Sequence, residues 1–557
     1  MIIWSGARPV PAAFRYDVGL MRLGPDDDVT IELELDELAL PDDEPRLLVA
    51  KLTQKLGGSP AELPPLEVRK RSLDARRGRV RFHLIVGVAR HAPLGGAPVR
   101  EVAGSPVVIV GGGPAGLFCA YELARAGVPA VIVDRGKPVQ ARRRDLKGLT
   151  QHGRVDPDSN YCFGEGGAGT YSDGKLYTRS HKRGDVRDVI ELLAIHGAPH
   201  EILVDARPHI GSNKLPKVIT ALRATLEAAG SQVRFGARAV ELIVHDRRAI
   251  GVRLADGDEV TGRAVVIATG HSARDVHDLL ARAGVMLEAK PFAMGVRIEH
   301  PQPLIDRIQY GRVAGHPALP AAAYKLAFTP DDKRGAFSFC MCPGGWIVPA
   351  ATEPDGVVVN GMSLSRRDSP YASSGLVVSI DVADLSRLGL PLPLGGVVLQ
   401  QRLERAAAIA GGGALRAPAT RATDFVRGRA SSTVAATSYQ PGLAAGDVGA
   451  VLDATGLPLA ARLREALTAF DHQMRGYLTE DAVLVGVESR TSSPVRIPRD
   501  RDRLESPDLA GLYPCAEGAG YAGGIVSAAL DGIRVARAIT GIAAPHPHAD
   551  PARETQA

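Results

Sequence analysis

The chain has 557 residues, more than one simple hydrophobic core accommodates, so two or three domains are expected. Hydrophobic residues make up 45% and charged residues 23% of the sequence, as in an ordinary soluble globular protein. The net charge of +5 is small for this length and argues against a dedicated nucleic-acid-binding protein, whose basic surface supplies most of its affinity.

The cysteine count and the apolar segments indicate the compartment. Five cysteines are an odd number and do not make a disulfide framework. No apolar stretch reaches the ~20 residues that span a bilayer, and the first 13 residues hold no signal-peptide core. We therefore expect a cytoplasmic protein in a reducing environment, without membrane contact and without a metal site.

Residues 14–95 are expected to form a small N-terminal α+β module. Arg46–Leu56 has helical spacing, and Leu66–Arg71 and Arg79–Val88 have the pattern of two strands. The basic cluster of this module comprises Arg69, Lys70, Arg71, Arg76, Arg77, Arg79 and Arg81. A solvated strand face is the preferred interpretation, and contact with phosphate or with a macromolecule such as tRNA is the alternative. Residues 91–104 have the composition of a linker.

A β-α-β unit follows the linker. Val107–Val110 is typical of a buried parallel strand, a helix is predicted over Ala115–Ala126, and Ala130–Val133 is the next strand. The turn between strand and helix matches Gly-x-Gly-x-x-Gly, the pattern that brings a helix N-terminus to a pyrophosphate, and an acidic residue at the second strand can bind the ribose. The predicted cofactor contacts here are Gly111, Gly113, Pro114, Ala115, Gly116, Asp134 and Arg135.

The remaining elements complete the expected domains. Leu215–Ala229 has helical spacing, residues 233–260 are predicted as short antiparallel strands, and Ala264–Ala268 as a buried strand. We expect a dinucleotide-binding domain from residues 105–285 and 486–542, a mixed α+β substrate or cap domain over 286–485, and a disordered tail at 543–557.

Three segments favour FAD over NAD. Val265–Gly270 ends in Ala-Thr-Gly and resembles the second fingerprint of the glutathione-reductase superfamily of flavoproteins. Gly511–Ile525 resembles the C-terminal flavin motif of that superfamily, with Glu517-Gly518 where Gly-Asp is more common. Phe163–Lys175 has the glycine density expected where backbone lies against a flat ring, with a mobile surface loop as the alternative. The FAD contacts predicted in these segments are Gly169, Thr170, Asp173, Gly174, Lys175, Ala268, Thr269, Gly270, Glu517, Gly518, Gly523, Gly524 and Ile525.

Longer motifs resemble one family. The segments are Arg69–Arg76, Gly164–Lys175, Gly270–Asp275, Pro291–His300, Phe337–Gly345, Gly486–Pro494 and Glu517–Ile525. Together they are similar to a bacterial family of uncharacterised FAD-dependent dehydrogenases. The resemblance implies an α/β fold with a Rossmann-type three-layer FAD-binding domain and FAD as cofactor, but it supplies no substrate. A second dinucleotide fingerprint is missing, since Gly411–Gly413 follows a helical pattern, so NAD(P)H would act without a Rossmann domain of its own.

Two residues are the preferred catalytic candidates. Lys175, at the end of the flavin loop, is expected to raise the flavin potential or bind an anionic substrate. Arg490 is expected to face the substrate, with an interdomain salt bridge as the alternative. His271 is a weaker candidate for a group near the flavin, with a local turn residue as the alternative.

Other polar residues leave the interpretation open. Arg297, Glu299 and His300 predict a strand with a polar face toward a pocket or toward solvent and salt bridges. Cys340 and Cys342 would need a bend in their strand to bond directly, so packing or one exposed thiol is preferred over a redox pair. The expected function is hydride transfer through flavin N5 to or from a small molecule, and the alternative is a flavoprotein that docks to a macromolecule such as tRNA through the basic hairpin.

Overall fold

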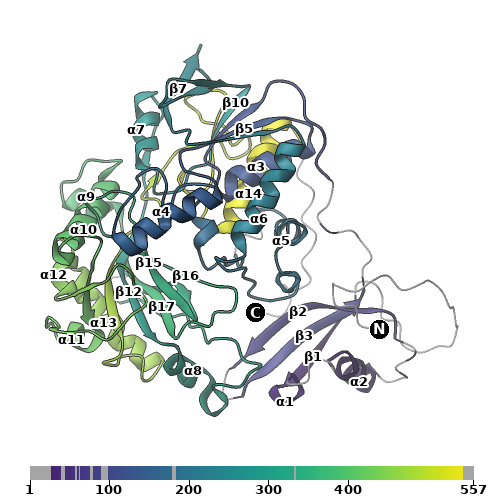
Figure 1. Ribbon diagram of the computed structural model, residues 1–557, viewed down its shortest axis with the longest axis vertical. Coiled ribbons are helices and arrows are strands. Elements are labelled where there is room, and N and C mark those ends of the chain that lie inside the picture. Colours follow the sequence, from purple (N-terminus) through teal and green to yellow (C-terminus); the bar gives the residue numbers. More distant parts are fainter. Residues whose placement is uncertain are drawn as a thin grey trace.

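The computed structural model describes residues 27–38, 44–56, 59, 61, 63–75, 79–89, 94, 98–178, 183–330 and 334–542. The predicted tail at 543–557 lies outside these residues, as do Arg76 and Arg77 of the basic cluster. Figure 1 shows a parallel sheet with its helices, a second and larger sheet below it, and the N-terminal strands to one side.

The N-terminal strands form a three-stranded antiparallel sheet in the order β1-β3-β2. Its elements are β1 (Asp28–Glu34), α1 (Leu35–Leu38), α2 (Glu44–Leu56), β2 (Leu66–Asp74) and β3 (Arg81–Val88). Alternate side chains of β1 and β3 are buried, since one face packs on a core and the other meets solvent.

Part of the basic cluster is neutralised by carboxylates. Arg69 pairs with Asp28 at 2.5 Å, and Arg71 pairs with Asp205 at 2.9 Å. Arg81 pairs with Glu32 at 2.8 Å. Docking of a macromolecule at this hairpin stays a prediction, and these ion pairs lower the positive charge that such docking would use.

The β-α-β unit belongs to a five-stranded parallel sheet in the order β22-β10-β4-β5-β6. The strands are β4 (Val107–Val110), β5 (Ala130–Asp134), β6 (Gln232–Phe235), β10 (Ala264–Ile267) and β22 (Leu512–Pro514). The prediction of antiparallel strands from residue 233 onward was wrong for β6, which pairs in parallel with β5. Its polar and charged residues at an edge position mask the apolar run that marks a buried parallel strand.

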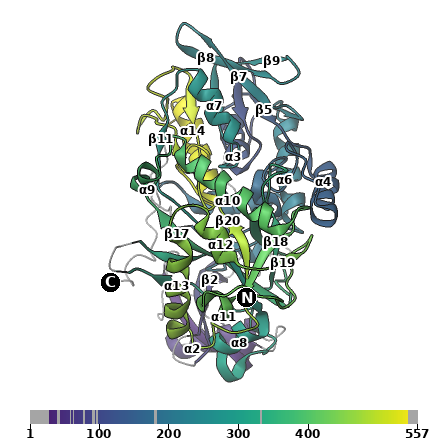
Figure 2. The same cartoon turned by 90° about the vertical axis from the view of Figure 1, so that its left-hand side faces the viewer.

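Alternate residues of the central strands pack against opposite layers. On one side lie α3 (Pro114–Arg125), α5 (Val186–Ile195), α6 (Leu215–Ala228) and α14 (Ile525–Thr540). On the other lie α7 (Arg274–Arg282) and an antiparallel sheet of β7 (Ala239–His245), β8 (Arg248–Leu254) and β9 (Glu259–Thr261). Helices α3 and α14 lie side by side against the sheet in both ribbon views (Figures 1 and 2).

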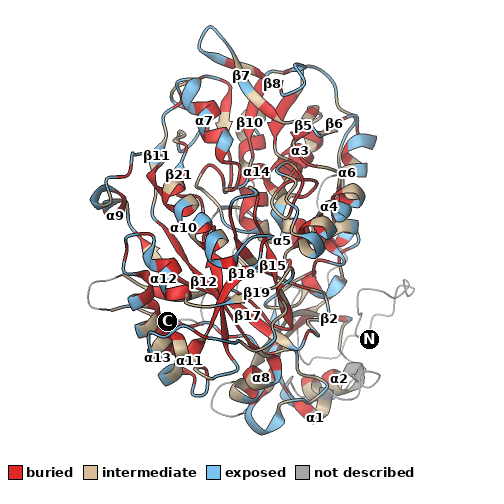
Figure 3. Ribbon diagram, turned by 60° about the vertical axis from the view of Figure 1, so that its left-hand side comes forward, coloured by how far each residue is buried: buried red, intermediate tan, exposed pale blue. Residues whose placement is uncertain are grey.

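A seven-stranded sheet forms the second core, in the order β13-β14-β17-β12-β20-β18-β19. Its strands are β12 (Phe292–Pro301), β13 (Ala327–Phe328), β14 (Ala336–Cys342), β17 (Tyr371–Ile380), β18 (Ala417–Arg421), β19 (Leu443–Ala445) and β20 (Val483–Glu488). The expected domain boundary between residues 485 and 486 falls inside β20. Figure 3 shows β12 and β17 buried in the interior of this layer.

Seven further α-helices and two short two-stranded ribbons lie in the described part of the chain. The helices are α4 (Val139–His152), α8 (Gln302–Tyr310), α9 (Val382–Arg387), α10 (Gly395–Gly411), α11 (Ala422–Val426), α12 (Val448–Asp453) and α13 (Leu459–Gln473). β11 (Glu288–Ala289) pairs with β21 (Val495–Arg496), and β15 (Gly345–Pro349) pairs with β16 (Val359–Ser363). Among the described residues, no helix has the length and apolarity needed to cross a bilayer.

Candidate functional site

A cavity of about 460 Å³ lies between the parallel sheet and the seven-stranded sheet. All four glycine-containing segments singled out in the sequence contribute to its wall: the turn at Gly111, the loop ending at Lys175, the Ala-Thr-Gly turn, and the segment before α14. Of the predicted cofactor contacts, Gly116, Thr170 and Gly518 are not among the lining residues, and the others are.

The turn after β4 is built from backbone. Gly111 has a φ of 110°, and a Cβ there would lie 2.8 Å from the Ala268 carbonyl oxygen. A Cβ on Gly116 would overlap the Gly111 carbonyl oxygen, so this glycine lets helix and turn meet. The N-cap of α3, Gly113, provides no side-chain cap, so the first N–H groups of the helix remain available for an anion.

Asp134 holds the same turn together. Its Oδ2 accepts from Gly112 N and its Oδ1 accepts from Gly136 N, each at 2.8 Å. A carboxylate has about four lone-pair sites, so Asp134 can still accept from a ribose hydroxyl on the cavity side. Beside it, Arg135 pairs with Asp158 and Asp275 and lies over the ring of Phe163, so its guanidinium is largely committed.

Arg142 organises the glycine-rich loop, and sequence reasoning missed it. Its side chain is 0% exposed and donates to the carbonyl oxygens of Asn160, Tyr161, Glu165 and Gly167 at 2.8–3.0 Å. Burial lowers the pKa of this guanidinium. A surface loop does not describe this segment, because its carbonyls surround a buried cation. The α4 sequence has three arginines in a row, and nothing in the sequence distinguishes Arg142 from its neighbours.

The Ala-Thr-Gly turn and the C-terminal glycine segment, both predicted to contact FAD, touch each other. Gly518 N donates to the Thr269 carbonyl oxygen at 3.0 Å, so the Ala-Thr-Gly turn and the C-terminal motif form one wall. Helix α14 begins after Gly524, which gives no side-chain cap and leaves its N–H groups open to the cavity. His271 Nδ1 lies 3.2 Å from Glu517 Oε1, so both residues are at the cavity, and their roles there stay predictions.

Lys175 reaches across the cavity toward the larger sheet. Its Nζ lies 3.7 Å from Cys340 Sγ, 3.6 Å from Cys342 Sγ and 3.6 Å from Asp173 Oδ2. Burial works against the charge, but the two thiols and Asp173 outweigh it and raise the pKa of Lys175. Arg367 donates to both carboxylate oxygens of Asp173, which ties this loop to the segment after β16.

Glu488 is a buried carboxyl at the cavity wall. It is 1% exposed, and its Oε2 accepts from Nη1 of the fully buried Arg297 at 2.8 Å. Burial raises the pKa of Glu488 to about 7, although Arg297 acts against this rise. A carboxyl with such a pKa can both give and take a proton at neutral pH. The sequence placed Glu488 beside the final FAD segment without giving it a role.

The polar residues of β12 are buried and paired, so a solvated face was wrong. Arg297 is bound to Glu488, and Glu299 accepts from Ser438 N at 2.7 Å. His300 Nε2 lies 2.8 Å from the Tyr477 carbonyl oxygen. Burial raises the pKa of Glu299 to about 7 and lowers that of His300 to about 4. None of these three residues is among those lining the cavity in the described chain.

Arg490 lies at the cavity wall, but its donors are in use. Its Nε and Nη2 donate to Glu404 at 3.0 and 2.8 Å, and its Nη1 donates to Thr352 Oγ1 at 2.8 Å. Arg274 binds the same carboxylate at 2.7 Å. The geometry therefore favours the salt-bridge interpretation of Arg490, and direct contact with substrate stays a prediction.

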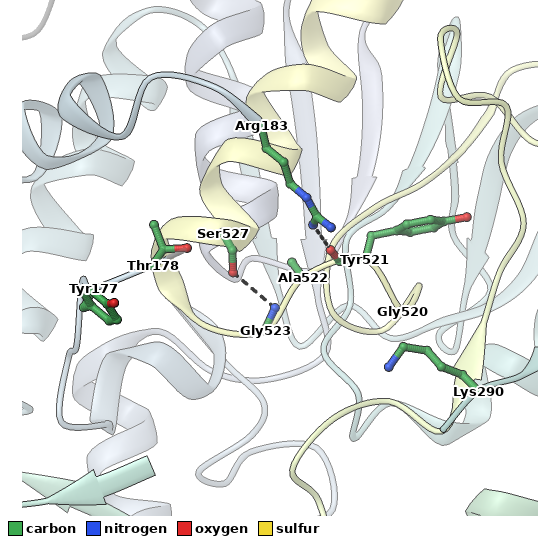
Figure 4. A pocket seen from close by; sticks show the side chains of 9 residues that line it. All are labelled: Tyr177, Thr178, Arg183, Lys290, Gly520, Tyr521, Ala522, Gly523 and Ser527. Carbon is green, nitrogen blue, oxygen red and sulfur yellow. Dashed lines mark hydrogen bonds between the residues drawn. The ribbon is translucent and has the colours of Figure 1, made fainter. Parts of the chain in front are cut away.

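A shallower pocket of about 450 Å³ adjoins the cavity and shares Tyr177, Thr178, Gly523 and Ser527 with it. Figure 4 shows Lys290 pointing into this pocket, with Arg183 donating to the Tyr521 carbonyl oxygen and Gly523 N donating to Ser527. Burial lowers the pKa of Lys290. The two cations make this pocket a suitable entrance for an anionic group.

Comparison with known proteins identifies the family. An uncharacterised protein from Clostridium beijerinckii is 38% identical over 525 residues, which cover 89% of this chain and 96% of the relative. This chain belongs to the same family. Residues 291–491 match the family described as FAD-dependent protein, C-terminal domain-like, and residues 104–154 match an FAD-binding domain. Residues 28–89 match a domain of unknown function.

Membership of this family identifies the cofactor. The turn, the two uncapped helix N-termini and the glycine loop are the donor set and the space that FAD requires, so the residues fit it. FAD is the cofactor of this family member, and the resemblance drawn from the sequence is confirmed to that extent. Affiliation with the glutathione-reductase superfamily in particular stays a prediction.

Several solved flavoprotein structures share a general likeness. CtdE in complex with FAD is 11% identical, with 78% of this chain and 84% of that chain covered and a TM-score of 0.30. A triple mutant of the flavin-dependent brominase Bmp2 is 13% identical, with coverage of 80% and 82% and a TM-score of 0.34. Glycine oxidase from Bacillus cereus is 12% identical, with coverage of 79% and 95% and a TM-score of 0.29. At TM-scores this low, the likenesses say nothing about what this chain does.

Proposed function

We propose that this protein is a cytoplasmic FAD-dependent oxidoreductase, of the dehydrogenase or reductase type, that acts on a small molecule. The observation that carries the proposal is the convergence of four separate glycine-containing segments on one cavity whose opposite wall is polar and buried. A Rossmann-type three-layer arrangement of the FAD-binding part agrees with the parallel sheet and its two covering layers. When bound, FAD supplies two-electron chemistry, with hydride transfer at N5.

Different residues of the chain would bind different parts of FAD and of the substrate. The turn at Gly111 and the N-terminus of α3 would hold the pyrophosphate, and Asp134 would accept from the adenosine ribose. The N-terminus of α14 would favour negative charge on the flavin ring. Lys175 would attract the anionic group of a substrate, which enters past Lys290 and Arg183.

Glu488 is the residue that would give a proton to the substrate or take one from it. It is the buried carboxyl of the cavity wall whose pKa is near neutrality, and Arg297 keeps it in place through one hydrogen bond. Because Oε2 holds that hydrogen bond, Oε1 is the atom that would give or take the substrate proton.

The absorbance spectrum of the purified protein tests the proposal. We expect flavin peaks that bleach on anaerobic addition of NADH or NADPH if a nicotinamide is the donor. A dehydrogenase reduced by its own substrate would keep its peaks with both nicotinamides and lose them with that substrate. A protein without flavin, even after reconstitution with FAD, would contradict the proposal.

A further inference from the structure

Cys340 lies at the cavity and Cys342 lies behind it, on a strand that is bent rather than straight. β14 has an irregular register between Phe339 and Cys342, and Cys340 has a φ of +45°, in the left-handed region that non-glycine residues rarely adopt. The strand is therefore bent at Cys340, so the regular alternation that would point the two side chains to opposite faces is interrupted. The two Sγ atoms lie 3.7 and 3.6 Å from the same Lys175 Nζ.

The two thiols differ in exposure. Cys340 is exposed and lines the cavity, whereas Cys342 is buried, with its Sγ 3.3 Å from the Cys340 carbonyl oxygen and 3.8 Å from Arg297 Nη2. One sulfur is thus accessible to a partner, and the other is held behind it. This asymmetry is typical of a pair in which one cysteine attacks and the second resolves.

The charges around the pair favour a thiolate. A hydrogen bond with the Cys342 side chain, together with the charges of Lys175 and Arg297, lowers the pKa of Cys340 well below its usual range, although burial acts against this shift. Two cations beside two thiols are the environment that distinguishes a reactive cysteine from a packed one. Cys119 and Cys515 have the opposite environment, because burial raises the pKa of both.

We propose that Cys340 and Cys342 are a redox-active pair that exchanges two electrons with the FAD in the same cavity and passes them to or from small thiols and disulfides. The Cys340 thiolate and the Cys342 thiol form one Sγ–Sγ bond. With FAD bound, two electrons and the proton of Cys342 would pass to oxidised FAD and give its singly protonated reduced form. In the disulfide state, a thiolate from solution attacks the exposed Cys340 Sγ and Cys342 leaves as the thiolate. A second thiolate then attacks the sulfur of the bound thiol, the two leave as a small disulfide, and Cys340 is released as the thiolate. This inference rests on the proposed function and names its substrate class.

Counting the electrons that the protein takes up per FAD tests whether the two cysteines are redox-active. The holoenzyme is treated with the thiol oxidant diamide, desalted, and titrated anaerobically with dithionite while flavin absorbance is followed. We expect the wild type to take about two dithionite equivalents per FAD and Cys340→Ser and Cys342→Ser to take about one. Cys119→Ala, whose thiol lies in α3 and not at the cavity, is the matched control and should keep two.

Alkylation and mass spectrometry on the same samples give a readout independent of turnover. The peptide with Cys340 and Cys342 should be protected in the oxidised holoenzyme and alkylated at both thiols after titration, while diamide-treated apoprotein keeps its disulfide under dithionite. One equivalent for the wild type, alkylation of both thiols after diamide, or reduction of the apoprotein disulfide by dithionite alone would each overturn the inference. Protein that binds no FAD would instead overturn the proposed function.

Discussion

The two walls of the cavity are built in different ways. The glycine wall, where we expect FAD to bind, is mostly backbone: a glycine turn, a glycine loop around Arg142, and two uncapped helix N-termini. The opposite wall consists of side chains from distant strands, among them Cys340 and Glu488, and Lys175 reaches across to it from the glycine loop. A wall of closely packed backbone leaves almost no space for added atoms. In a wall of charged side chains, ion pairs and hydrogen bonds set the pKa values of the groups. Substitutions on the first should therefore cost cofactor binding, and those on the second should change chemistry.

The largest effect is expected from Arg142→Ala. The substitution removes a hydrogen-bond donor from four carbonyl groups, two of them buried and two half-buried, and within the described chain only the Glu165 carbonyl keeps another side-chain donor, Thr170 Oγ1. We therefore expect loss of roughly 3–5 kcal/mol of stability together with loss of FAD. Urea unfolding and the flavin-to-protein absorbance ratio measure both. Arg143→Ala, in the same helix with an exposed side chain, is the control. A yellow, wild-type-like Arg142→Ala protein would show that the loop is held by other contacts.

Gly116→Ala should weaken FAD binding by roughly a hundredfold, because the new Cβ overlaps the Gly111 carbonyl oxygen and displaces the turn. Gly148→Ala is the matched control. It lies in α4 with no atom within 4 Å of the added Cβ, so it should be neutral or stabilise the protein by up to about 1 kcal/mol. Fluorescence titration of apoprotein with FAD measures both. Equal affinities would contradict the close approach of helix and turn.

The pKa values of about 7 allow Glu488 and Glu299 to be distinguished. Both pKa values are raised in the folded state, so the native protein binds more protons than the unfolded chain. As pH rises from about 4.5 to about 7, each group thus lowers the free energy of unfolding, by roughly 3 kcal/mol if the whole pKa shift is present. In Glu488→Gln and in Glu299→Gln, the free energy of unfolding should therefore depend less on pH over this range.

The two variants should differ in catalysis. Only Glu488 lines the cavity, so an inflection of the reductive half-reaction near pH 7 should vanish in Glu488→Gln and persist in Glu299→Gln. Stopped-flow flavin absorbance from pH 5 to 9 measures it. An inflection that survives in Glu488→Gln would assign the proton to another group.

The smallest effect concerns Lys175→Met. Removing the ammonium raises the pKa of Cys340, so alkylation of this thiol by iodoacetamide at pH 7 should slow several-fold, and its pH profile should shift upward. Lys217→Met, on the exposed face of α6, is the control and should leave the profile unchanged. An unshifted profile in Lys175→Met would place the charge of Lys175 outside the reach of the thiol.

The glycine segments of the cavity wall could be picked out from the sequence because each of them is a local pattern, and that they contact FAD stays a prediction. Gly111–Gly116 and Glu517–Ile525 carry their geometry in consecutive residues, so spacing alone indicates their role. The arrangement of the other wall could not be predicted, since Cys340 and Glu488 lie on strands far apart in the chain and only the strand order of the sheet brings them to one side of the cavity. The bend at Cys340 was invisible for the same reason: nothing in Phe-Cys-Met-Cys indicates a positive φ.

The contact of the N-terminal sheet with the rest of the chain has a mechanical consequence. Arg71 exchanges backbone hydrogen bonds with Val204 and Ala206, and the segment that follows hydrogen-bonds the flavin loop through Leu176, Gly174 and Asp173. Only a few peptide units thus separate the edge of β2 from the Lys175 ammonium. Force applied to the N-terminal sheet would therefore be transmitted along this short stretch to the loop that carries Lys175.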